Sequence, residues 1–239
     1  MKIKSHTLYQ GGALVTDEQK KLGQRYAIFA EASYYPNPED VRKILDKYGK
    51  QAWDIVPMTT KDATTFKNRD TGQVIVGIRG TDLKNISDLF TDLALIGGVS
   101  RFTPRASEIT KIVKYAIDTY GKENVSVSGH SLGGELARQM ANKFGIKGYV
   151  YNRAASVFDV FNKKNENIKD FSTNIGSTSD IVSFMGTKQK KHDQAEFEKL
   201  KDKDAHTLMN FLPQTEDEIK QTGTGRWIMR TKIKFNPYL

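Results

Sequence analysis

The sequence predicts a single α/β domain with a mostly parallel sheet and helices on both of its faces. The middle of the chain alternates strand, helix, strand, helix and strand, which is typical of parallel sheets because each helix returns the chain across the sheet. The length of 239 residues suits one such domain. No internal repeat or linker divides residues 1–239, so we expect one domain over the whole chain.

Two helices are expected before the first long strand. Residues 17–34 place apolar side chains on one helical face. The second helix has stronger end signals, because Asn37 can cap it, Pro38 suits its first position and Gly49 can end it.

A β-hairpin is expected over residues 62–79, with its turn at 68–72. The second strand, 73–78, is apolar for most of its length, which is typical of a strand covered on both faces. An amphipathic helix then begins at Pro104 and ends at Gly121.

The second half continues the alternation. We expect strand, helix and strand over 124–128, 132–144 and 146–151. Short strands around 170–175 and 181–184, an exposed charged segment over 186–204 and an edge strand over 226–235 complete the prediction.

A G-x-S-x-G motif lies between a predicted strand and a predicted helix, as Gly129-His130-Ser131-Leu132-Gly133. A serine in such a turn adopts a strained conformation, and glycines two residues before and after it avoid steric clashes. The turn lifts the hydroxyl above the sheet and directs the helix N-terminus toward it. The motif therefore predicts a nucleophilic Ser131, while a glycine-rich turn without chemistry is the alternative.

Two blocks of sequence resemble the class 3 (fungal-type) lipase family of the α/β hydrolase superfamily. Residues 125–137 read VSVSGHSLGGELA and look like the nucleophile region, and residues 74–93 read VIVGIRGTDLKNISDLFTDL and are similar to the family's second block. Leu89 and Ile78 depart from the Trp and Phe that are usual there. The resemblance implies an α/β-hydrolase fold and a serine carboxylic-ester hydrolase that cleaves acylglycerol or phospholipid esters.

A serine nucleophile needs a base, and in this fold the chain order should be Ser, acid and His. His192 and His206 are the two histidines that follow Ser131. His206 is favoured because an apolar stretch after it can anchor it, whereas His192 lies among lysines. The resemblance gives His130 no role as the base.

Asp180 is the favoured acid, because it lies between Ser131 and His206 and its surroundings resemble the family's strand-end loop. Asp159 and Asp170 are the other candidates, and a carboxylate that caps local backbone amides is the alternative for Asp180.

The oxyanion hole needs two donors. The backbone N–H of Leu132 suits one of them, because it starts the helix directly after the nucleophile. The resemblance implies Thr81 as the other, and Gly80 would let its loop approach closely. The resemblance also implies a lid over residues 83–99, for which a helix packed permanently on the core is the alternative.

Charge and composition limit the remaining function classes. The 37 Lys and Arg residues exceed the 28 Asp and Glu residues, for a net charge of +9, without a basic tail or a zinc-finger pattern. We expect the protein to bind no nucleic acid, cofactor or metal. We expect a monomer that acts on a lipid or small ester substrate and makes transient contact with an anionic membrane. The absence of Cys excludes a thiol nucleophile.

Neither a signal peptide nor a transmembrane segment is recognisable, which favours a cytoplasmic protein or one delivered by another route, such as a virus particle. Two further functions stay open. One is a hydrolase of soluble acyl esters or thioesters without interfacial activation, and the other is a catalytically silent binding or structural protein with a lipase fold.

Overall fold

The computed structural model describes the chain in several ranges. The backbone is described for residues 8–10, 13–14, 17–80, 102–152 and 171–177, with Leu208 and Leu212 in addition, and side chains are described for 24–80, 104–152, 171–172 and those two leucines. The predicted lid at 83–99 lies outside these residues, as do the segments at 181–184, 186–204 and 226–235.

Eight strands form one sheet in the order β2-β1-β8-β7-β6-β5-β4-β3. The strands are β1 (Leu8–Gln10), β2 (Ala13–Leu14), β3 (Trp53–Ile55), β4 (Ala63–Asn68), β5 (Val74–Ile78), β6 (Val125–His130), β7 (Lys147–Tyr151) and β8 (Ser172–Ser177).

The sheet is mixed, which corrects the prediction of a mostly parallel sheet. Strands β5, β6, β7 and β8 pair in parallel, and all the other pairings are antiparallel. The short connections between β3, β4 and β5 require antiparallel pairing, because a parallel pair needs a long crossover. At the other edge, β1 and β2 add to β8 in the antiparallel sense. Sequence patterns missed these two strands and β3, because runs of two or three residues show no periodicity.

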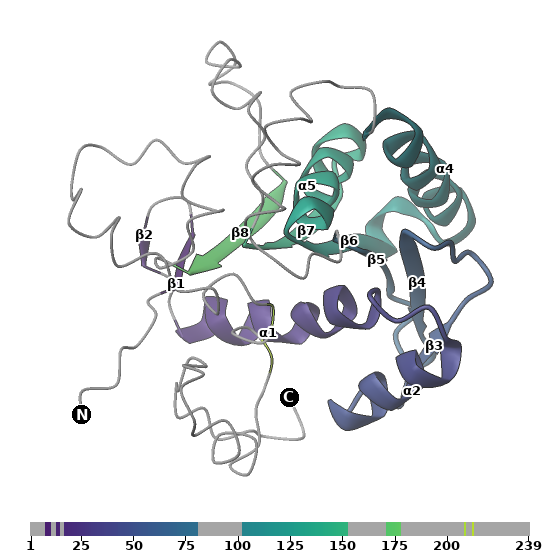
Figure 1. Ribbon diagram of the computed structural model, residues 1–239, viewed down its shortest axis with the longest axis horizontal. Coiled ribbons are helices and arrows are strands. Elements are labelled where there is room, and N and C mark those ends of the chain that lie inside the picture. Colours follow the sequence, from purple (N-terminus) through teal and green to yellow (C-terminus); the bar gives the residue numbers. More distant parts are fainter. Residues whose placement is uncertain are drawn as a thin grey trace.

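Helices cover both faces of the sheet, as predicted (Figure 1). One face carries α1 (Asp17–Ala32) and α2 (Pro38–Lys47), and the other carries α4 (Phe102–Tyr120) and α5 (Leu132–Phe144). A short 3-10 helix, η1 (Lys122–Asn124), leads from α4 into β6. The α/β class is therefore confirmed.

Strand β5 divides the hydrophobic core into two layers. Its five residues are all buried, and Ile75 packs with the residues of α1 and α2, whereas Val74, Val76 and Ile78 pack with those of α4 and α5. Alternating side chains of a strand point to opposite faces, so a continuously apolar strand serves both layers. At Gly77 an added Cβ would lie 2.5 Å from the carbonyl oxygen of Phe29, so this glycine lets α1 approach the sheet closely.

Several local predictions are confirmed. Asn37 caps α2, with its Oδ1 accepting a hydrogen bond of 2.9 Å from the amide of Glu39. The hairpin forms with Ala63 opposite Ile78 and Phe66 opposite Ile75. These features depend on residues near one another in the sequence, which is why local patterns identify them.

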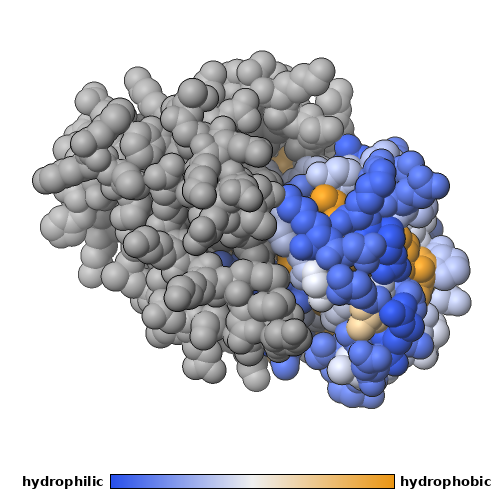
Figure 2. All heavy atoms as spheres, turned by 90° about the horizontal axis from the view of Figure 1, so that it is seen from below, coloured by the Kyte–Doolittle hydropathy of each residue, from blue (hydrophilic) through white to orange (hydrophobic). Residues whose placement is uncertain are grey.

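The described surface is mainly hydrophilic on the face shown in Figure 2, with a few hydrophobic spots. The large hydrophobic residues exposed within the described ranges are Tyr115 and Phe171. None of the helices in those ranges combines the length and the apolar composition that crossing a bilayer requires.

Candidate active site

Ser131 occupies a sharp turn between the end of β6 and the start of α5. Its backbone has φ +57° and ψ −124°, and within the described ranges Asn152 is the other non-glycine residue with positive φ. Such a conformation costs on the order of 1–3 kcal/mol and persists only where the surrounding structure imposes it. The amide of Ser131 donates a 3.0 Å hydrogen bond to the carbonyl oxygen of Tyr151, which ties the turn to the end of β7.

The two motif glycines are required by backbone packing. An added Cβ at Gly129 would lie 2.2 Å from the carbonyl oxygen of Gly133. An added Cβ at Gly133 would lie 2.3 Å from the carbonyl oxygen of Ile78 and 2.6 Å from that of Arg79. These atoms belong to the backbone and cannot rotate away. The expected steric role of both glycines is therefore confirmed.

The first turn of α5 starts directly after Ser131. Leu132 is its first residue, and the carbonyl oxygen of Ser131 accepts a 3.2 Å hydrogen bond from the amide of Glu135. The first amides of a helix have no acceptor within the helix, and they lie at the positive end of its dipole. This geometry favours negative charge beside the Ser131 turn.

The loop after β5 approaches the same turn and is held at Arg79. The amide of Arg79 donates to the carbonyl oxygen of Asp62 at 3.0 Å, and the guanidinium of Arg105 donates to the carbonyl oxygen of Arg79. Arg105 Nε also lies 3.2 Å from Asp62 Oδ1, and both of these side chains are only 18% exposed. Burial lowers the pKa of Arg105, and the Asp62 carboxylate opposes that effect. Arg105 thus connects the start of α4 with the end of β5.

Tyr34 connects this loop with the end of β6. Its hydroxyl oxygen lies 3.0 Å from Nδ1 of His130, and the backbone amide of Gly80 also hydrogen-bonds to it. Burial, together with the negative charge of Glu31, raises the pKa of Tyr34 above its ordinary value. The hydroxyl therefore stays protonated at neutral pH. His130 is buried, and its ring is hydrogen-bonded to the Tyr34 hydroxyl.

The structure places only part of the predicted site. Ser131 and Leu132 are adjacent at the turn, with Gly80 close by. Other predicted residues lie outside the described ranges: Thr81, Asp159, Asp170, Asp180, His192 and His206. The apolar stretch expected to anchor His206 is buried at Leu208 and Leu212, which join the core layer of α1 and α2.

Sequence reasoning missed three side chains near the turn: Tyr34, Asp62 and Arg105. No motif marks them, and their contacts join segments far apart in the chain. In the ranges with described side chains, no three His, Cys, Asp or Glu residues converge to hold a metal ion. The expectation of no metal or cofactor stays a prediction.

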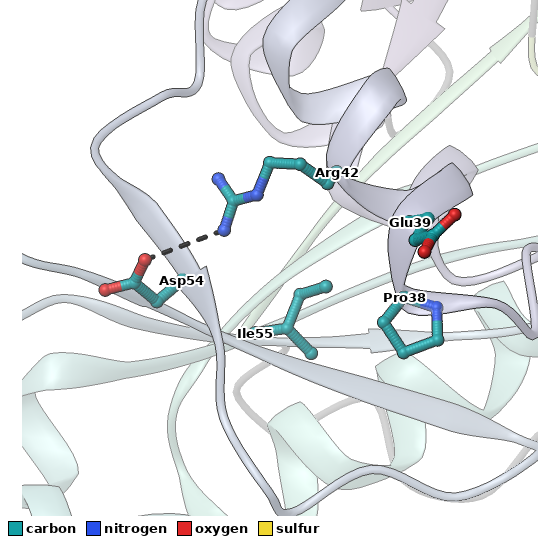
Figure 3. A pocket seen from close by; sticks show the side chains of 5 residues that line it. All are labelled: Pro38, Glu39, Arg42, Asp54 and Ile55. Carbon is teal, nitrogen blue, oxygen red and sulfur yellow. Dashed lines mark ion pairs between the residues drawn. The ribbon is translucent and has the colours of Figure 1, made fainter.

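A surface hollow of about 530 Å³ lies between α2 and β3, away from this turn (Figure 3). Arg42 and Asp54 line it and form an ion pair of 3.6 Å. Arg42 also donates a 2.8 Å hydrogen bond to the carbonyl oxygen of Trp53, and Asp54 pairs with Arg69 at 2.6 Å. The charged groups that line the hollow therefore connect α2 with the edge strand β3, which indicates a structural role for the hollow.

Comparison with known proteins gives a likeness in structure only. Neither the family models nor the curated proteins match the sequence. A Rhizomucor miehei lipase in a propeptide complex, a deletion mutant, is similar at 14% identity and a TM-score of 0.41, over 65% of this chain and 57% of the lipase chain. A fungal lipase–inhibitor complex, described as a model for interfacial activation, is similar at 16% identity and a TM-score of 0.42, over 64% of this chain and 69% of the other. This chain thus spans little more than half of the first lipase chain.

Proposed function

We propose that this chain is a serine ester hydrolase with Ser131 as its nucleophile. The supporting observation is the Ser131 turn itself, which holds a non-glycine residue at φ +57° between a parallel strand and a helix. Backbone contacts that only glycine tolerates at 129 and 133 hold it there. A strand–helix turn this strained is expected where a nucleophile is lifted above the end of a sheet, and Ser131 itself is buried at this turn.

In the proposed reaction, Ser131 Oγ attacks the acyl carbonyl carbon while His206 takes its proton. Asp180 orients the imidazole, and the amide of Leu132 and Thr81 bind the oxyanion. His206 then protonates the leaving alcohol, and water hydrolyses the acyl-enzyme. The roles of Asp180, His206 and Thr81 rest on chain order and on the resemblance to class 3 lipases.

For the substrate we propose acylglycerol or phospholipid esters, as the same resemblance implies. The net charge of +9 supports a transient approach to an anionic membrane, because each Lys or Arg near such a surface contributes about 1 kcal/mol.

Labelling with a fluorophosphonate probe tests the nucleophile. We expect wild type to be labelled, Ser131→Ala to be unlabelled, and Ser126→Ala to be labelled like wild type. Ser126 is the matched control because it lies on β6, the strand that leads into the Ser131 turn, with its hydroxyl 3.5 Å from the carbonyl oxygen of Val74. Labelling that persists in Ser131→Ala contradicts the assignment, and an unlabelled wild type favours a silent binding protein.

Esters of increasing acyl-chain length test the substrate class. A lipase should accelerate when its substrate forms micelles or vesicles. Turnover that saturates on monomeric short esters and does not rise with aggregation favours the soluble esterase instead.

A further inference from the structure

Three segments that are distant in the sequence meet at the hydroxyl of Tyr34. Tyr34 lies two residues after the end of α1, His130 ends β6, and Gly80 belongs to the loop after β5. The hydroxyl oxygen lies 3.0 Å from His130 Nδ1 and also hydrogen-bonds to the amide of Gly80. One side chain therefore joins the two segments that border the Ser131 turn.

The contact at Gly80 is too close for any other residue. An added Cβ there would lie 2.1 Å from the Tyr34 hydroxyl oxygen and 2.8 Å from the carbonyl oxygen of His130. The loop after β5 is thus packed directly between Tyr34 and the end of β6. The Tyr34 hydroxyl therefore lies against both neighbours.

One direction of these two hydrogen bonds uses the Tyr34 hydroxyl both as acceptor and as donor. The Gly80 amide donates to the Tyr34 oxygen, and the Tyr34 hydroxyl donates to His130 Nδ1. This direction requires the His130 tautomer that carries its proton on Nε2. The hydroxyl accepts on one side and donates on the other, so phenylalanine at this position removes both bonds while keeping the ring.

We infer that Tyr34 is a positioning residue of the proposed ester hydrolase. It sets the separation between the Ser131 turn and the loop that precedes Thr81. This role rests on the proposed function. Gly80 directly precedes the proposed oxyanion donor Thr81, and His130 directly precedes the proposed nucleophile. Oxyanion donors act only within about 2.7–3.1 Å of the developing charge, so their separation from the nucleophile must be held closely.

Tyr35→Phe is a matched control for Tyr34→Phe. Tyr35 is the next residue, and its hydroxyl donates a 3.1 Å hydrogen bond to Glu31 Oε1 on α1. Both substitutions delete one tyrosine hydroxyl at the end of the same helix. A difference between them in kinetics therefore reports the location of the hydroxyl and not its loss as such.

The experiment measures kcat and KM on p-nitrophenyl butyrate, the rate of fluorophosphonate inactivation, and the melting temperature. We expect Tyr34→Phe to lower kcat and the inactivation rate about tenfold with KM within about twofold, since a loss of about 1.4 kcal/mol is a factor of ten. Arg105 still holds Arg79 in this variant, which limits the loss. Tyr35→Phe should stay within about twofold of wild type in both rates.

A kcat for Tyr34→Phe equal to that of Tyr35→Phe overturns the positioning role, as does a loss confined to KM. If Tyr34→Phe does not fold, His130→Asn and His130→Leu test the same bond, because the Asn carbonyl oxygen can still accept it. We then expect Asn to retain more of kcat than Leu, and equal losses overturn the inference.

A wild type that neither hydrolyses the ester nor reacts with the probe overturns the proposed function, and this role with it. An active wild type with an unaffected variant overturns this role alone.

Discussion

Gly133→Ala adds one methyl group where the first turn of α5 meets the end of β5. The new Cβ would lie 2.3 Å from the carbonyl oxygen of Ile78 and 2.6 Å from that of Arg79, whereas ordinary contact begins at 3.4 Å. The helix or the strand end must therefore shift by about 1 Å at the Ser131 turn. Overpacking of this kind costs about 3 kcal/mol, and the better helix propensity of alanine returns about 1 kcal/mol.

Gly134→Ala is the control, because Gly134 is the next residue of the same turn. Its Cβ would meet its nearest atoms at 3.2–3.4 Å, so small adjustments suffice and the helix-propensity gain offsets them. Both substitutions change the unfolded chain equally. The difference between them therefore isolates the contact with the end of β5.

Thermal unfolding followed by circular dichroism measures the effect. A net loss of about 2 kcal/mol should lower the melting temperature of Gly133→Ala by about 4–8 °C, since each kcal/mol shifts a domain of this size by about 2–4 °C. Gly134→Ala should melt within about 2 °C of wild type. Equal melting temperatures for the two variants would refute the reasoning, because they would mean that the backbone contact at Gly133 is easily relaxed.

Three further predictions concern single residues. Arg105→Met should cost about 2 kcal/mol in urea unfolding, because it leaves the Arg79 carbonyl without its charged donor, and an unchanged midpoint would contradict this. Asn37→Ala should cost about 1 kcal/mol by removing the cap of α2, whereas Asn37→Asp should retain most of it. Burial raises the pKa of Glu31 despite its bond from Tyr35, so the folded state holds this proton more tightly than the unfolded state. Its contribution to stability should be present below the unfolded pKa and lost as pH rises through the folded pKa. Glu31→Gln should remove that part of the pH dependence of stability. Identical stability–pH profiles for Glu31→Gln and wild type would contradict this.

The predicted site divides into a local part and a distant part. Ser131, Leu132 and the glycines around them are contiguous, so a five-residue pattern between a strand and a helix sufficed to locate the turn and its steric demands. Asp180 and His206 stay predictions, as does Thr81, because chain order and resemblance support them and the described residues do not include them.

The fold shows the same division. The α/β class, the hairpin and the cap at Asn37 depend on periodicity and on neighbours within a few residues, and all are confirmed. The mostly parallel sheet was wrong because short strands at both edges pair antiparallel, and two or three residues cannot show a period of two.

The sequence by itself determined the alternation of strands and helices, the strained turn at Ser131 and the absence of any thiol chemistry. Only the tertiary structure decided what surrounds that turn. Tyr34 and His130 are 96 residues apart in the chain and form a hydrogen bond of 3.0 Å. Arg105 reaches the Arg79 carbonyl from 26 residues away. Local sequence patterns report steric and hydrophobic preferences of neighbouring residues, whereas these polar contacts exist only once α1 and α4 have packed on opposite faces of the sheet.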